Sequence, residues 1–62
     1  MFILFSFKYS PFDKIAIREE DIVEVVSTNE GESVTVYTKN GEIINVAETL
    51  SEVLEALNGK EN

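Results

Sequence analysis

The chain has 62 residues, which is enough for one small domain, and a domain of this size buries only about 60% of the surface that its unfolded chain exposes. Hydrophobic residues make up 44% of the sequence and charged residues 27%, as in folded globular proteins and unlike disordered segments. The net charge is −7, and the sequence contains no histidine and no cysteine, which excludes disulfide frameworks and Cys/His zinc sites.

The charge is unevenly distributed along the chain. Residues 1–18 carry three basic side chains and one acidic side chain, so their charge is +2, whereas residues 19–62 carry eleven acidic and two basic side chains, or −9. A phosphate backbone is bound by clustered Lys and Arg, so direct nucleic-acid binding is not expected. No apolar run is long enough to span a membrane, and a small domain without disulfides is expected in the cytoplasm.

Residues 1–12 hold five of the six aromatic side chains. Aromatic residues alternate with polar residues over positions 5–10, which predicts an aromatic first strand that ends at Pro11, with Phe5, Phe7 and Tyr9 on one face. This face is interpreted as a cap on the core or as a contact with a second copy of the chain. Two other interpretations have less support, since a signal peptide needs a basic start and a cleavage site, and a membrane-surface anchor needs more basic residues.

Residues 14–47 are predicted to form a β-meander. Residues 14–18 read as a short strand, and residues 22–28 are mostly β-branched, which favours a strand buried on both sides near its middle. Residues 33–39 alternate cleanly, with Tyr37 on the exposed face as a further candidate contact residue. Asn40-Gly41 predicts a hairpin with a type I′ turn, followed by a return strand over residues 42–46.

A C-terminal helix is predicted for residues 49–58. Thr49 and Glu52 have the spacing of a capping box, and Gly59 occupies the position that often follows a helix end. An apolar stripe at helical spacing is expected to pack on the sheet, formed by Leu50, Val53, Leu54 and Leu57. The predicted fold is therefore α+β: a single domain, residues 1–62, with a small antiparallel β-meander of four or five strands, one amphipathic helix and a tail at residues 59–62.

The residue inventory argues against catalysis. Without His or Cys the commonest general base and the most reactive nucleophile are missing, and no glycine pattern suits a phosphate-binding loop. The best acidic group is Glu19, Glu20, Asp21 and Glu24, which could in principle bind Mg²⁺ or Ca²⁺. Its spacing matches no EF-hand loop, so we expect a solvated acidic contact surface, with no metal, no cofactor and no enzymatic activity.

The spacing from Asn40 onward, together with one upstream strand, resembles the small flagellar proteins of the FlbD and SwrD type. The resemblance covers roughly residues 15–57 and rests on Asp21-Ile22-Val23-Glu24-Val25 and on Asn40, Gly41, Val46, Glu48, Thr49, Leu50, Glu52 and Val53. The chain departs from that pattern at residues 10–13 and at Arg18, and LytTR-type domains share a similar strand-turn-strand-helix order. The resemblance implies a small cytoplasmic accessory protein without enzymatic activity, linked to motility through protein contacts.

Two hypotheses of function follow. The first is a protein-interaction or regulatory module, expected to form homo-oligomers, in which the aromatic first strand or an open sheet edge contacts a second copy or another protein. The second is an acidic inhibitor, encoded by a phage or another mobile element, that presents carboxylates to a basic groove of a nuclease or similar enzyme.

Overall fold

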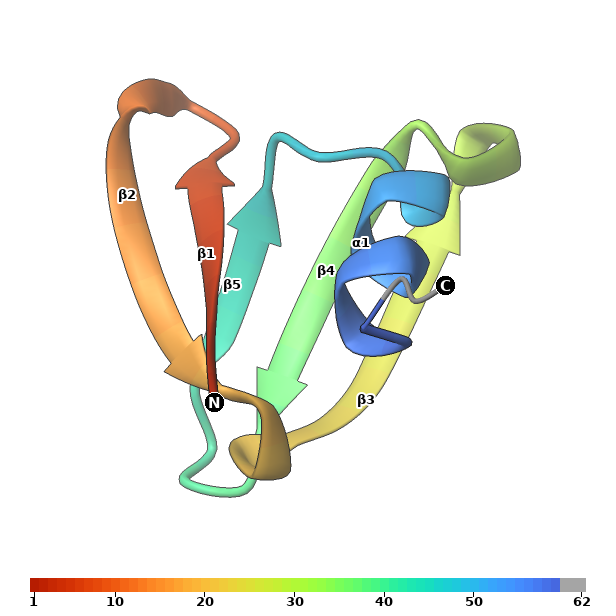
Figure 1. The fold of residues 1–62 in the computed structure, drawn as a ribbon. Coiled ribbons are helices and arrows are strands. Elements are labelled where there is room, and N and C mark those ends of the chain that lie inside the picture. Colours follow the sequence, from red (N-terminus) through yellow and green to blue (C-terminus); the bar gives the residue numbers. More distant parts are fainter. Residues whose placement is uncertain (60–62) are drawn as a thin grey trace.

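The computed structural model describes residues 1–59, which form five strands followed by one α-helix (Figure 1). The elements are β1 (Phe2–Phe7), β2 (Ser10–Arg18), β3 (Ile22–Thr28), β4 (Ser33–Thr38), β5 (Ile43–Val46) and α1 (Leu50–Leu57), with short 3-10 turns at Glu19–Asp21 and Asn29–Gly31. This arrangement confirms the α+β class predicted from the sequence. Of the predicted tail, residues 60–62 lie outside the described residues.

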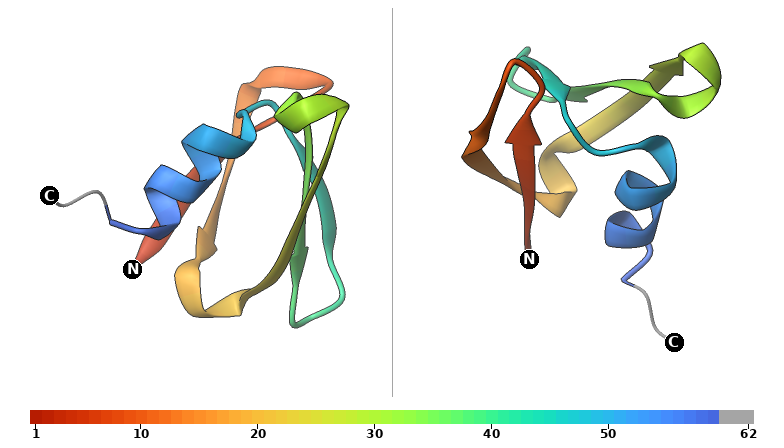
Figure 2. Two further views of the ribbon diagram at one scale, coloured as in Figure 1. Left: turned by 90° about the vertical axis from the view of Figure 1, so that its right-hand side faces the viewer. Right: turned by 90° about the horizontal axis from the view of Figure 1, so that it is seen from above.

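The sheet consists of two wings that meet at a single residue pair. Its strand order is β2-β1-β5-β4-β3 with antiparallel pairing throughout. The β1–β2 hairpin and the β3–β4–β5 meander share only the pair of Phe7 with Val46. Figure 2 shows the two wings at an angle, with α1 on the concave side between them. The helix therefore covers the inner faces of both wings.

Hydrogen bonds beside the shared pair hold the wings together. The Lys8 N–H donates to the Asn45 carbonyl at 2.9 Å, and the Ala47 N–H donates to the Ser6 carbonyl at 2.8 Å. The Glu48 carboxylate accepts a further bond from the Ser6 N–H, with its two oxygens at 3.1 and 3.0 Å. A side chain from the loop before α1 thus satisfies a strand amide where β5 no longer runs alongside β1.

The Glu19–Asp21 turn joins the wings at the opposite end of the sheet. The Glu19 N–H donates to the Met1 carbonyl at 2.9 Å, next to the start of β1. The Asp21 carbonyl accepts from the Lys39 N–H at 2.9 Å, just after β4. This acidic turn is therefore part of the scaffold and carries backbone bonds from both wings.

The N-terminal segment differs from the single aromatic strand predicted for residues 1–12. The chain turns at Lys8 and Tyr9, and Ser10 then lies opposite Phe7 as the first residue of β2. Pro11 lies inside β2 and does not end a strand, so that prediction was wrong. An edge strand accommodates proline because one side of its backbone has no neighbour to bond.

The Asn40-Gly41 hairpin is present, but its turn type differs from the prediction. The Thr38 N–H donates to the Glu42 carbonyl at 3.1 Å, and the Gly41 N–H donates to the Thr38 carbonyl at 3.0 Å. Gly41 has a φ of 88°, whereas Asn40 does not have a positive φ. This is a three-residue loop that ends in a left-handed glycine, a common alternative to the two-residue type I′ turn.

β3 is an edge strand and not the doubly buried strand predicted from its composition. None of its seven residues is buried, and its register with β4 is shifted by a bulge between Ile22 and Glu24. Its partner β4, by contrast, buries Val34, Val36 and Thr38. β-branched residues favour any pleated position, so composition alone did not distinguish an edge strand from a central one.

The helix begins with the predicted capping box. The Glu52 N–H donates to the Thr49 hydroxyl at 3.3 Å, and the Thr49 N–H donates to the Glu52 carboxylate at 2.9 Å. Gly59 follows the helix with a φ of 74°, in agreement with its predicted role.

The buried face of α1 is centred on Val53, which is fully buried. At about 100° per residue Leu54 lies about 100° from that centre. Leu54, which was predicted to pack on the sheet, is accordingly 45% exposed, and Ala56 packs against the core in its place.

The core lies between the two wings and the helix. Its buried apolar side chains come from β1, β2, β4, β5 and α1, namely Ile3, Phe5, Ile17, Val34, Val36, Ile44, Val46 and Val53. Half-buried apolar residues from β3 and both ends of α1 pack around them. The core therefore ends at β3, beyond which the described part of the chain has no further strand.

Candidate interaction surfaces

The four aromatic residues predicted as a protein interface do not form one surface. Phe5 is 1% exposed and belongs to the core, so it is not available for contact with a partner. Phe7 is half-buried against the core, and Tyr9 lies in the hairpin turn, 83% exposed. Tyr37 is on β4, in the other wing, and half-buried. The predicted strand that would place Phe5, Phe7 and Tyr9 on one face is therefore not formed, because Tyr9 lies in the turn. Of the two interpretations of that face, the cap on the core fits Phe5 and Phe7.

The outer face of the β1–β2 hairpin carries a group of exposed side chains that sequence analysis missed. We call it the hairpin face and define it by Phe2, Leu4, Lys14, Ala16 and Arg18. The register places Phe2 opposite Arg18 and Leu4 opposite Ala16, so these side chains share one side of the sheet. Phe2 is 66% exposed and Leu4 is 63% exposed. The hairpin face is thus an apolar centre between two basic side chains.

The sequence contains a weak signal for this face. Residues 2–5 are all apolar, so their alternation does not reveal which pair faces the core. The partner strand provides the missing information, because Lys14 and Arg18 mark its outer side and Ile15 and Ile17 its inner side. Pairing β1 with β2 in register would have assigned Phe2 and Leu4 to the outside.

A second exposed area is a shallow groove between the hairpin turn and β5. We call it the β5 groove; it has a volume of about 370 Å³ and is lined by Phe7, Lys8, Tyr9, Ser10, Asp13, Ile43, Ile44 and Asn45. Two of the predicted interface residues, Phe7 and Tyr9, meet here beside Ile43, which is 65% exposed. Tyr37 lies opposite Ile43 in the β4–β5 register and therefore adjoins the groove.

Polar contacts fix one wall of the β5 groove. The Lys8 ammonium donates to the Ser33 hydroxyl at 2.9 Å and lies 5.9 Å from the centre of the Tyr9 ring. Lys8 thereby crosses from the hairpin turn to β4 and keeps Tyr9 beside a cation. A second hollow, of about 230 Å³, lies between β2 and the β4–β5 turn.

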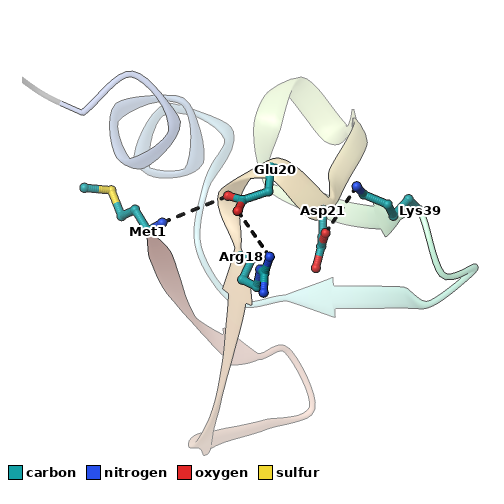
Figure 3. A network of polar contacts seen from close by, with 5 residues as sticks. All are labelled: Met1, Arg18, Glu20, Asp21 and Lys39. Atoms are coloured by element: carbon teal, nitrogen blue, oxygen red, sulfur yellow. Dashed lines mark ion pairs between the residues drawn. The ribbon is translucent and has the colours of Figure 1, made fainter.

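Three of the four predicted acidic residues form the Glu19–Asp21 turn, and two of them have basic partners. The Glu20 carboxylate lies 3.5 Å from Arg18 and 4.0 Å from the Met1 ammonium, and the Asp21 carboxylate lies 3.6 Å from Lys39 (Figure 3). The hydrogen bond with its own backbone amide, and then the Met1 ammonium, hold the pKa of Glu20 below its usual value. These exposed ion pairs reduce the negative potential of the turn and add little stability.

Glu24 lies apart from the other three acidic residues. It is on the outer side of β3, opposite Tyr37. Within residues 1–59 no group of three or more acidic side chains is close enough to hold a metal ion. In the same range no helix is long and apolar enough to cross a membrane.

Comparisons with protein-family models, with curated proteins and with solved structures gave no match to this chain. The resemblance to the flagellar proteins therefore stays an expectation from the sequence. Several residues that carry it have structural roles here: Gly41 forms a turn, Glu48 binds the Ser6 amide, and Thr49 with Glu52 caps α1. Such residues suit the fold whatever the protein binds.

Proposed function

We propose that this chain is a non-enzymatic, cytoplasmic protein-interaction module that contacts a partner protein through its hairpin face. The exposure of Phe2 and Leu4 carries the proposal, because both large apolar side chains are mostly open to solvent and adjacent on one face. A small domain gains nothing in its own stability from such positions, whereas an interface gains from burying them. The absence of His and Cys from the sequence supports a binding role over catalysis.

The basic side chains on the hairpin face indicate the chemistry of the partner. Lys14 and Arg18 flank the apolar centre, and residues 1–18 carry +2 in a chain whose remainder carries −9. A matching surface would present an apolar patch with carboxylates at its rim. Such rim pairs are screened over about 8 Å at physiological ionic strength, so added salt should weaken binding.

The test compares two aliphatic substitutions of similar exposure. Leu4→Ser alters the hairpin face, while Ile43→Ser alters the β5 groove and serves as the matched control. Immobilised protein is incubated with a lysate of the source cells, and retained proteins are quantified by mass spectrometry at low and high salt. We expect one acidic protein to be retained by the unsubstituted chain and by Ile43→Ser, and lost with Leu4→Ser or high salt. Equal retention by Leu4→Ser would refute the proposal.

The alternative, an acidic inhibitor of a nuclease or another nucleic-acid enzyme, has less support. Ion pairs partly neutralise two of its proposed contact residues, Glu20 and Asp21, although Arg18 of the hairpin face shares one of these pairs. The remaining carboxylates, including Glu24, are spread over several elements. The motility link implied by the flagellar resemblance is compatible with the hairpin-face proposal and would place the partner in the flagellar apparatus.

A further inference from the structure

The sheet has two open edges, β2 and β3, and they differ in how they resist pairing with another strand. β2 contains Pro11, Lys14 and Arg18, which are residues that discourage strand addition at an edge. β3 contains no proline, no glycine and no basic residue, and five of its seven residues are β-branched. Its bulge lies near the start, so residues 24–28 pair regularly with β4. Residues 24–28 are therefore open to a further strand.

The backbone groups that β3 presents to solvent follow from the ladder. The Thr38 N–H donates at 3.1 Å to the carbonyl of Glu42, the residue before β5, so the main-chain groups of Thr38 face the β5 side of β4. Backbone groups alternate between the two sides of a strand, so those of Thr35 face β3, where Val26 lies opposite. The N–H and C=O groups of Val25 and Ser27 consequently face away from the sheet, where no strand within residues 1–59 lies beside them.

We propose that β3 pairs with β3 of a second copy of this chain, antiparallel and related by a two-fold axis at Val26. In this register Val25 lies opposite Ser27 of the second copy, and each of the two such pairs exchanges two hydrogen bonds. The Val26 side chain, 40% exposed, meets its own counterpart on the outer face of the sheet. Glu24 lies opposite Thr28 of the second copy, so no like charges face one another.

Neighbouring registers fit less well. Placing the axis at Glu24 sets two carboxylates directly opposite, which is destabilising. Placing it at Val25 brings the bulge beside Val23 into the new ladder. The Val26 register uses the regular part of β3 and extends cover over the half-buried Val25, where the core is open.

The contact should be weak, and its salt response should differ from that of the hairpin face. Each chain carries −7, so two copies repel one another at a distance, and added salt should strengthen the dimer by screening this repulsion. Partner binding at the hairpin face should instead weaken with salt. The dimer does not depend on the hairpin-face function, because β3 and the hairpin lie in different wings.

The first test uses cysteines, which the natural chain lacks. Directly opposed residues that exchange no hydrogen bonds have Cα atoms about 4.5 Å apart, within the range of a disulfide. Val26→Cys should therefore give a disulfide-linked dimer as its main product with oxidised glutathione. Thr28→Cys is the matched control, since its two copies would lie about 14 Å apart across the axis. Equal yields of disulfide-linked dimer from the two variants would overturn the proposed register.

The second test places the same charge at two positions and expects opposite effects. Val26→Lys sets two ammonium groups face to face, so the dimer should be lost in sedimentation equilibrium experiments. Thr28→Lys sets each ammonium opposite a Glu24 of the second copy, so the dimer should strengthen. Both positions are exposed, and circular dichroism verifies that each monomer stays folded. The proposal would be overturned if the unsubstituted chain stayed monomeric in high salt, or if Val26→Lys and Thr28→Lys had the same effect on dimer formation.

Discussion

Phe5 and Phe2 provide a direct test of which face of β1 supports the fold. They are the same residue type, three positions apart on one strand, yet Phe5 is 1% exposed and Phe2 is 66% exposed. A phenylalanine-to-alanine change in a core costs about 3–5 kcal/mol. A chain of this length has a free energy of unfolding of about 3–9 kcal/mol, so Phe5→Ala would leave little folded protein.

The gentler pair Phe5→Leu and Phe2→Leu keeps both variants measurable. Phe5→Leu should lower the free energy of unfolding by about 1–2 kcal/mol, because the ring fills a closed part of the core and leucine leaves a cavity. Phe2→Leu should change it by less than about 0.5 kcal/mol, since the ring contributes little to the core.

Urea unfolding at 25 °C, followed by far-ultraviolet circular dichroism, measures both effects. With a slope of about 1 kcal/mol per molar urea, the Phe5→Leu midpoint should fall by about 1–2 M and the Phe2→Leu midpoint should hardly move. Repeating the titration at two protein concentrations separates folding from self-association. Equal shifts for the two variants would refute the assignment of inner and outer faces on β1.

Two further substitutions test local features of the structure. Glu48→Ala should lower the free energy of unfolding by about 1–3 kcal/mol, because it leaves the part-buried Ser6 amide without its acceptor. Glu48→Gln keeps one side-chain oxygen and should lower the free energy of unfolding by less. Urea unfolding of both variants measures the difference. Glu30 has a φ of 56°, in the left-handed region, so Glu30→Gly should raise the free energy of unfolding by up to about 1 kcal/mol and raise the melting temperature with it. Glu32 has a φ of −80°, so Glu32→Gly should lower the melting temperature. A destabilising Glu30→Gly would contradict this account of the turn.

The sequence by itself determined the features that depend on near neighbours. The Thr49 and Glu52 capping box acts over three residues, and the Asn40-Gly41 hairpin over a single turn, so both were predictable from local chemistry. The same holds for the α+β class, which follows from alternating segments and one helical stripe. Local chemistry also predicted that the helix ends shortly before Gly59.

The tertiary structure alone decided which faces and edges are exposed. Phe2 and Phe5 are equivalent in a run of apolar residues, and only pairing with β2 and packing against α1 place one outside and the other in the core. The exposed edge at β3 depends on where β1 joins the sheet, beside β5 instead of beside β3. The bond from Ser6 to Glu48 links residues 42 positions apart. Such contacts are set by the free energy of the whole packed core, which no short stretch of sequence contains.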